Sequence, residues 1–197
     1  MKKHLYSVFY NEQDLLQGII DIHLNGMDIE LDPMYFKGNF YKDGIKKPKY
    51  IFDKRKTTED VAIGDATNLH FDDCTFENMI LDPPFLFEKR KRKQNNYSAL
   101  THTILYGFEE LEKLYKGIIK ESYRILKKNG VLIFKCQDYT DSKTTITHTF
   151  VQKWAEEQGF YTKDLAILVK ENKIYNSKTT QRHFRKVHTY FFVFIKK

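Results

Sequence analysis

Four short apolar runs in the first part of the chain each lead to an aspartate, and this repetition constrains the fold more than any other feature of the sequence. The runs have the length and pattern of β-strands, and the aspartates are Asp32, Asp53, Asp65 and Asp82. In a mostly parallel sheet, ligands bind at the carboxyl ends of the strands. We therefore expect a ligand site near these aspartates.

Helices and further strands alternate along the rest of the chain. Helices are expected where apolar residues recur at intervals of three and four, in residues 12–24, 109–127 and 149–158, which end at Asn25-Gly26, Asn129-Gly130 and Gly159. Later strands are expected at residues 131–135, 166–169 and 190–195. This alternation predicts the α/β class, with a mostly parallel sheet flanked by helices.

The length and composition of the chain fit one globular domain. With 197 residues, of which 41% are hydrophobic, the chain can bury a substantial core, and we expect a single domain over residues 1–197. No apolar run approaches the roughly 18 residues of a membrane span, and the start is too polar for a signal peptide. Cys74 and Cys136 lie in or beside apolar runs, as buried, reduced thiols do. These features predict a cytoplasmic protein without a membrane-spanning segment.

Basic residues exceed acidic residues by 33 to 26, which gives a formal net charge of +7. Such an excess favours polyanionic partners, because lysine and arginine neutralise phosphates and release counterions. Many basic proteins bind no nucleic acid, so the charge alone does not identify the partner.

The segment Asp82-Pro83-Pro84-Phe85 directly follows the fourth apolar run and carries the most specific chemistry. Two consecutive prolines fix the backbone, so that the Asp82 carboxylate and the Pro83 carbonyl can point to one place. An exocyclic amino nitrogen of adenine or cytosine is a poor nucleophile because its lone pair is delocalised into the ring. Two acceptors that bind both amino hydrogens would favour its attack on a methyl donor, while Phe85 stacks on the extruded base. A rigid loop after a strand is the alternative explanation of this segment.

With this segment the sequence resembles the S-adenosylmethionine-dependent amino-methyltransferases, and most of all the small DNA adenine methylase-like proteins of phages and prophages. The catalytic signature of that class is Asp, Asn or Ser followed by Pro-Pro and an aromatic residue. The supporting segments are residues 28–41, 64–66, 82–85, 134–138 and 185–188, and their order, with the donor-binding strands before Asp-Pro-Pro-Phe, extends over almost all of the chain. The resemblance implies a Rossmann-like class I methyltransferase fold, S-adenosylmethionine as the cofactor, and Asp82, Pro83, Pro84 and Phe85 as the catalytic residues.

The resemblance also implies a donor site on the first three strand ends. Asp53 would accept hydrogen bonds from the ribose hydroxyls, and Asp65 and Ala66 would meet the adenine of the donor. The loop after the first strand would supply Asp32, Pro33, Tyr35, Lys37 and Gly38. A structural role as turn or capping residues is the alternative for Asp53 and Asp65.

The loop after the first strand departs from the pattern of the family. Typical members have two glycines there, which let backbone N–H groups approach the methionine part of the donor, whereas this loop has only Gly38. The 16 residues between Asp32 and Lys49 also include Gly44 and Pro48. We therefore expect the usual crossover helix to be absent or reduced to a turn.

Two basic segments are candidates for DNA contacts. One is the run Lys89, Arg90, Lys91, Arg92 and Lys93, directly after the Asp-Pro-Pro-Phe segment, and the other includes Arg182, Arg185 and His188. Solvated loops are the alternative. Lys135 and Gln137 lie at another strand end, where a pocket role and a structural role are equally open. No histidine or cysteine has the spacing of a metal site, so no metal is expected.

The sequence thus predicts a DNA methyltransferase that acts on adenine N6, with cytosine N4 next, because both bases present the same amino chemistry. The chain has no room for a separate target-recognition domain, so loops or a partner subunit would select the DNA sequence. Methylation of RNA or of a glutamine amide, and a module that keeps the fold without catalysis, are the rival hypotheses.

Overall fold

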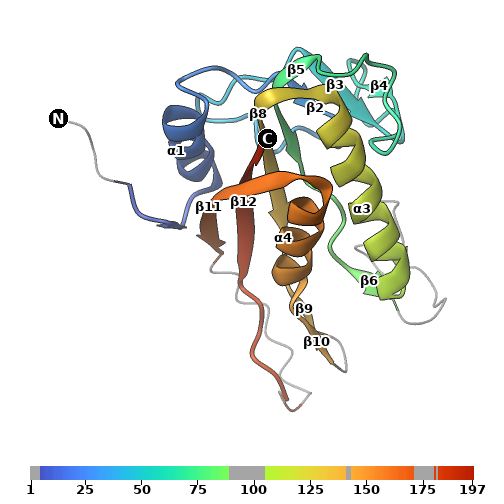
Figure 1. Cartoon of the computed structure of the whole chain (residues 1–197). Coiled ribbons are helices and arrows are strands. Elements are labelled where there is room, and N and C mark those ends of the chain that lie inside the picture. Colours follow the sequence, from blue (N-terminus) through green and yellow to red (C-terminus); the bar gives the residue numbers. More distant parts are fainter. Residues whose placement is uncertain (1–4, 89–104, 141–142, 171–179, 181) are drawn as a thin grey trace.

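A computed structural model describes residues 5–88, 105–140, 143–170, 180 and 182–197. Its centre is an eight-stranded sheet with strand order β1-β11-β12-β8-β5-β2-β3-β4 (Figure 1). These strands span Val8–Phe9 (β1), Leu31–Asp32 (β2), Tyr50–Asp53 (β3), Ala62–Ile63 (β4), Phe76–Leu81 (β5), Leu126–Cys136 (β8), Phe160–Val169 (β11) and His188–Lys196 (β12). Two small pairs, β6 (Phe87–Glu88) with β7 (Leu105–Tyr106) and β9 (Tyr139–Thr140) with β10 (Thr144–Thr145), lie outside it.

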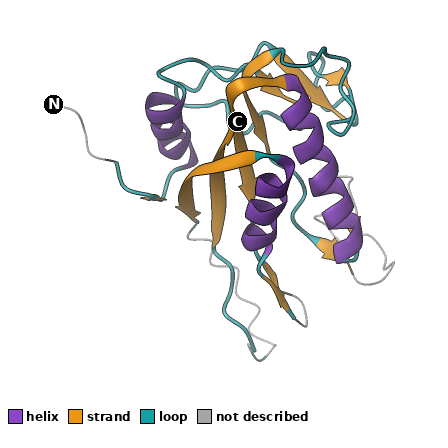
Figure 2. Ribbon diagram, viewed as in Figure 1, coloured by secondary structure: helices purple, strands orange, loops and turns teal. Residues whose placement is uncertain are grey.

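Helices cover both faces of this sheet, as Figure 2 shows. Helix α1 (Glu12–His23) packs Leu15, Leu16 and Ile19 on one face. Helices α3 (Phe108–Ile125) and α4 (Thr147–Gln158) pack on the other face, with Tyr115 and Trp154 in the larger core. The expected α/β class, with a mostly parallel sheet flanked by helices, is confirmed. No helix within the described residues is both long and apolar enough to cross a bilayer.

Most neighbouring strands are parallel, and β12 is antiparallel to both β8 and β11. The chain runs outward from β2 to β3 and β4, and then returns to place β5 on the other side of β2. This reversal is a topological switch point, where a crevice opens at the carboxyl ends of the two inner strands. Asp32 ends β2 and Asp82 follows β5, so both lie at the switch point.

Strand β2 (Leu31–Asp32) is shorter than the strand that the alternation at Asp28 to Asp32 predicts. The buried Asn78 side chain explains the difference, because it accepts a hydrogen bond from the Glu30 N–H (3.0 Å) and donates one to the Asp28 carbonyl (3.2 Å). A side chain thus replaces part of the backbone ladder between β2 and β5. The segment between β2 and β3 contains turns and no helix, as expected.

The long helix ends earlier than the expected stop at Asn129-Gly130. Its last carbonyls are satisfied by the preceding loop, since the Thr75 N–H donates to the Ile125 carbonyl (2.7 Å). Leu126 is therefore already extended, and Asn129 lies inside β8 with a φ of 65°. The prediction that both cysteines are buried is also wrong for Cys74, which is exposed in a turn.

Strand β11, which pairs antiparallel with β12, begins at Phe160 and not at Ala166. Its first half contains polar residues and a shift in register between Thr162 and Asp164, which hide the strand period. Pairing with β12 maintains the strand there despite the weak pattern.

Candidate active site

A cavity of about 390 Å³ lies at the switch point. It gathers Asp32, Pro33, Tyr35, Asp53, Asp65, Ala66, Asp82, Pro83, Pro84 and Phe85 from the residues that the sequence singled out. Sequence reasoning did not assign Met34, Phe36, Asn39, Phe40, Lys54, Leu114 and Lys170, which also line it. The volume is within the range of small-molecule sites, roughly 300 to 1,000 Å³.

The loop after β2 is held by carboxylates at the strand ends. Asp32 accepts hydrogen bonds from the Met34 N–H (3.0 Å) and the Tyr41 hydroxyl (2.7 Å). Asp53 accepts one from the Phe36 N–H (3.0 Å). The Tyr35 N–H donates to the carbonyl of Phe52 (3.0 Å). These backbone N–H groups are therefore occupied within the protein and are not presented to a ligand.

Asp32 is almost completely buried, with 1% of its surface exposed. Burial raises its pKa to about 7, although the hydrogen bonds from Tyr41 and Met34 act in the opposite direction. The nearby carboxylates of Asp82 and Asp53 raise the pKa further. A cation in the cavity would therefore favour the ionised form of Asp32.

The single glycine of the loop has a packing role in this structure. Gly38 has a φ of 64°, and a Cβ atom there would collide with the Tyr35 hydroxyl oxygen. Gly38 and Lys37 do not line the cavity, and the exposed Lys37 ammonium lies over the Phe36 ring at 5.5 Å. The structure thus does not place these two predicted donor residues beside the others.

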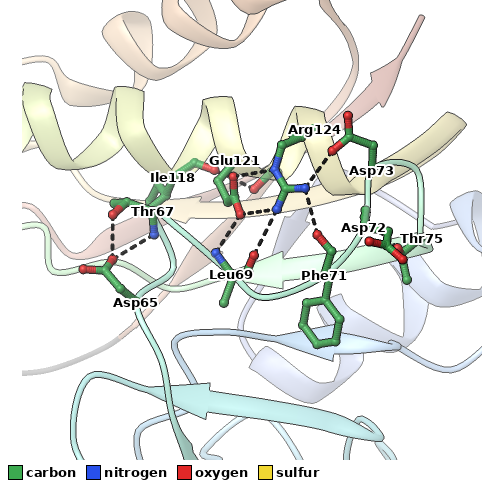
Figure 3. Close-up of polar contacts among 11 residues, drawn as sticks. Asp65, Thr67, Leu69, Phe71, Asp72, Asp73, Thr75, Ile118, Glu121 and Arg124 are labelled. Carbon is green, nitrogen blue, oxygen red and sulfur yellow. Dashed lines mark hydrogen bonds and ion pairs between the residues drawn. The ribbon is translucent and has the colours of Figure 1, made fainter.

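Asp65 serves its own turn and also faces the cavity. Its Oδ1 atom accepts hydrogen bonds from the Thr67 N–H (2.9 Å) and the Thr67 hydroxyl (2.7 Å), as Figure 3 shows. Its Oδ2 atom lies 3.4 Å from the Lys54 ammonium. Burial raises the pKa of Asp65, but these partners outweigh it and the pKa is lowered. Asp65 is thus a charged acceptor at the cavity wall.

A polar network fixes the segment that follows Asp65 on helix α3 (Figure 3). The buried Glu121 carboxylate accepts a hydrogen bond from the Leu69 N–H (2.7 Å) and pairs with Arg124 (2.7 Å). Arg124 also donates to the carbonyls of Leu69 (3.0 Å) and Phe71 (2.8 Å) and pairs with Asp73. We refer to Glu121 and Arg124 with these partners as the α3 clamp. Sequence reasoning missed it, because its partners are about fifty residues apart.

The Asp82-Pro83-Pro84-Phe85 segment forms another part of the cavity wall. Asp82 and Phe85 are half-buried, and Pro83 is buried. The fully buried Tyr115 of α3 donates a hydrogen bond to the Pro84 carbonyl (3.2 Å). The Oδ2 atom of Asp82 accepts a hydrogen bond from the Lys135 ammonium (2.9 Å). The segment is therefore anchored on both sides of its prolines.

The candidate DNA-contact residues lie in part beyond the described structure. Lys89, Arg90, Lys91, Arg92 and Lys93 are outside the described residues. Arg185 lines a second cavity, of about 310 Å³, together with Leu86 and Gln137. Leu86 directly follows Phe85 in the sequence, so this second cavity adjoins the Asp-Pro-Pro-Phe segment.

His188 belongs to a polar group with Gln137 and Asp138, which line that second cavity. Its ring lies 2.9 Å from the Tyr190 hydroxyl, which donates to the buried Asp138 carboxylate (3.3 Å). Gln137 donates to the carbonyls of Lys186 and His188. Gln137 therefore serves a structural role between β8 and β12. In the described part of the chain, no group of three or more His, Cys, Asp or Glu side chains could hold a metal ion.

Comparison with solved structures identifies the class of this fold. A TehB-like SAM-dependent methyltransferase from Corynebacterium glutamicum is 12% identical, with 95% of this chain and 88% of that chain covered and a TM-score of 0.51. TrmN from Thermus thermophilus is 14% identical, with coverages of 93% and 48% and a TM-score of 0.51. The PvuII DNA methyltransferase, described as cytosine-N4-specific, is 18% identical, with coverages of 68% and 48% and a TM-score of 0.50. The chain therefore has the Rossmann-like methyltransferase fold.

The sequence places the chain more narrowly within that class. The N6/N4 DNA methylase family model matches residues 77–197, which is more than half of the chain, so the protein belongs to the DNA methylase family. The match begins within β5 and includes the catalytic segment, whereas the first three strand ends precede it. The chain spans about half the length of the first structures that it matches. No curated protein matches this chain in sequence.

Proposed function

We propose that the protein transfers a methyl group from S-adenosylmethionine to the exocyclic amino group of a DNA base, with adenine N6 as the first candidate and cytosine N4 as the second. The observation that carries the proposal is the position of Asp82 and Phe85 in the same cavity as Asp53 and Asp65. Membership of the DNA methylase family supports DNA as the substrate.

The side chains of the cavity fit the chemistry of this donor. Asp53 and Asp65 offer acceptors suited to ribose hydroxyls and to an adenine amino group, and Ala66 lines the wall beside Asp65. Lys54 and Lys170 line the same cavity and can pair with a carboxylate. The two ammonium groups would thus bind the carboxylate in the methionine part of the donor, because the backbone N–H groups of the loop after β2 already have partners within the protein. When bound, the donor supplies an electrophilic methyl group on a sulfonium.

The catalytic segment would bind and orient the amine that accepts the methyl group. Asp82 accepts a hydrogen bond from one N–H of the amino group and the Pro83 carbonyl accepts one from the other N–H. These two bonds direct the nitrogen lone pair toward the donor. Phe85 provides a flat surface for an extruded base. The bond between the methyl carbon and the donor sulfur breaks as the new bond to nitrogen forms, which leaves a neutral thioether and positive charge on the nitrogen. The Asp82 carboxylate stabilises this charge as it develops, and the nitrogen then loses one of its protons to water.

The test is to incubate the protein with methyl-labelled donor and with duplex DNA, RNA or protein in separate reactions, and to identify the product by mass spectrometry. We expect label in DNA, as N6-methyladenine or N4-methylcytosine. Label only in RNA or in glutamine would assign the same chemistry to another substrate. Donor binding without any labelled product would support a binding module and contradict the proposal.

A further inference from the structure

A buried lysine joins the catalytic segment to the first helix of the chain. The Lys135 ammonium, from the carboxyl end of β8, lies 2.9 Å from Asp82 Oδ2 and 2.9 Å from Glu12 Oε1. Only 9% of the Lys135 side chain and 13% of the Glu12 side chain are exposed. Three segments that are far apart in the sequence thus meet in one ion-pair chain.

Aromatic rings fix the position of the lysine between the two carboxylates. The Lys135 ammonium lies 4.7 Å from the centre of the Phe40 ring and 5.6 Å from that of the Phe191 ring. Burial lowers the pKa of Lys135, but Asp82 and Glu12 together outweigh it and hold the pKa above its ordinary value. The lysine is therefore charged, and its position leaves little freedom to either carboxylate.

The charges of the three ion-paired side chains, Glu12, Lys135 and Asp82, have a direct consequence for the reaction. Lys135 alone would cancel the charge of Asp82, whereas Glu12 restores one net negative charge to the group of three. A net negative charge at the wall favours a reaction in which positive charge develops on the amine, and the effect is stronger where water is excluded. Lys170 also lies near Glu12, at 3.5 Å, and offsets part of this charge, but its side chain is 45% exposed, so solvent weakens its effect compared with that of the buried Lys135.

We propose that Glu12 and Lys135 are positioning residues for Asp82: Lys135 holds one carboxylate oxygen so that the other faces the acceptor amine, and Glu12 holds Lys135 and offsets its charge. This inference rests on the proposed function. The rival explanation is that the ion pairs only join α1 to the sheet. Buried ion pairs add little net stability compared with apolar packing, so stability alone does not explain them.

The test combines Glu12→Gln, Lys135→Met and the double variant. Glu12→Gln keeps the size of the side chain and removes its charge. We expect kcat to fall about 10-fold in Glu12→Gln and about 100-fold in Lys135→Met, similar to the loss of one preorganised group in other active sites. The double variant should be no slower than Lys135→Met, because Glu12 acts only through the lysine. The donor Kd measured by calorimetry should remain within about twofold for Glu12→Gln.

Asp14→Asn is the matched control, because Asp14 is the other acidic residue in the first turn of α1 and its side chain is exposed. It removes the same charge from the helix terminus and should leave kcat unchanged. Multiplicative losses in the double variant, or an equal loss in Asp14→Asn, would overturn the inference.

A crystal structure of Lys135→Met provides a readout that does not depend on activity. The inference predicts that the Asp82 carboxylate leaves its position once Lys135 is removed. An unchanged Asp82 rotamer would overturn it, even if the wild-type protein methylates no DNA. Failure of the proposed function would instead appear as an inactive wild type.

Discussion

At the scale of single residues, the buried Asp32 should make the proposed donor site dependent on pH. Its pKa of about 7 exceeds the ordinary value of 3.8, so protonation favours the folded protein. Its contribution to stability is complete below the unfolded pKa and is lost as the pH rises through about 7. A cationic donor favours the ionised form.

We therefore expect the donor to bind more tightly at about pH 8 than at about pH 6, with release of a proton near neutral pH. Asp32→Asn should remove this dependence and make the protein more stable at the higher pH. Calorimetric titrations in buffers of different ionisation enthalpy would measure the proton release. A donor affinity that is independent of pH in the wild type would contradict this role for Asp32.

Asp65 carries a second prediction at this scale. Asp65→Ala should weaken donor binding by about 1 to 3 kcal/mol, because the adenine amino group loses its acceptor. The same substitution also removes the turn hydrogen bonds to Thr67, so Thr67→Ala serves as the control for the turn. If both variants bind the donor with equal affinity, Asp65 acts only as a turn residue.

Several single residues were predictable because their chemistry is local. Asp82-Pro83-Pro84-Phe85 and Asp65 follow apolar runs directly, and the structure brings them to one cavity. The partners of Asp32 and Lys135 were not predictable, because Tyr41 and Glu12 reach them through the fold and no periodic pattern links them. Gly38 was assigned to the donor, whereas its backbone angle and the Tyr35 hydroxyl account for it.

At the scale of elements, the α3 clamp positions the loop that carries Asp65 and Ala66. Arg124→Met should destabilise the protein by about 1 to 3 kcal/mol, because Glu121 loses a charged partner and two carbonyls lose their donor. Donor binding should weaken as well, since the loop is released. Lys116→Met, which breaks an exposed pair with Glu112 on the same helix, is the control. Chemical denaturation would measure the stability, and calorimetry would measure the donor affinity. Unchanged donor affinity in a destabilised Arg124→Met would contradict the claim that the clamp positions the donor site.

Most elements were predictable from periodicity and stop signals, as α1 and α4 show with their C-terminal caps at Leu24 and Gly159. The errors fall where tertiary contacts decide the boundary. Asn78 shortens β2, the segment at Thr75 ends α3, and pairing with β12 extends β11. Each of these contacts joins distant parts of the chain, so a local pattern does not contain it.

At the scale of the whole molecule, the excess of positive charge and membership of the DNA methylase family together predict binding to DNA through phosphates. Neutralising Lys89, Arg90, Lys91, Arg92 and Lys93 together should weaken binding to all DNA sequences alike and leave donor affinity unchanged. The logarithmic salt slope should become shallower by about 0.9 for each lost contact. Fluorescence titrations with duplex DNA at several salt concentrations would measure the slope. An identical salt slope in the wild type and in this variant would assign the phosphate contacts to Arg182, Arg185 and Lys186 instead. A variant in which these three residues are neutralised is the parallel experiment.

The order of the strands places the first aspartates and the catalytic segment at one switch point, although the family model matches only residues 77–197. This arrangement is the basis of the central claim that one cavity holds both the methyl donor and the base. Asp82 is assigned to the base and not to the donor, so its removal should separate the two events.

The most direct test is therefore Asp82→Ala, with methyl transfer to DNA followed by mass spectrometry and donor binding followed by calorimetry on the same preparation. We predict that methyl transfer is lost while the donor Kd stays close to that of the wild type. Near-normal turnover in Asp82→Ala would contradict the claim that this segment binds the reacting amine.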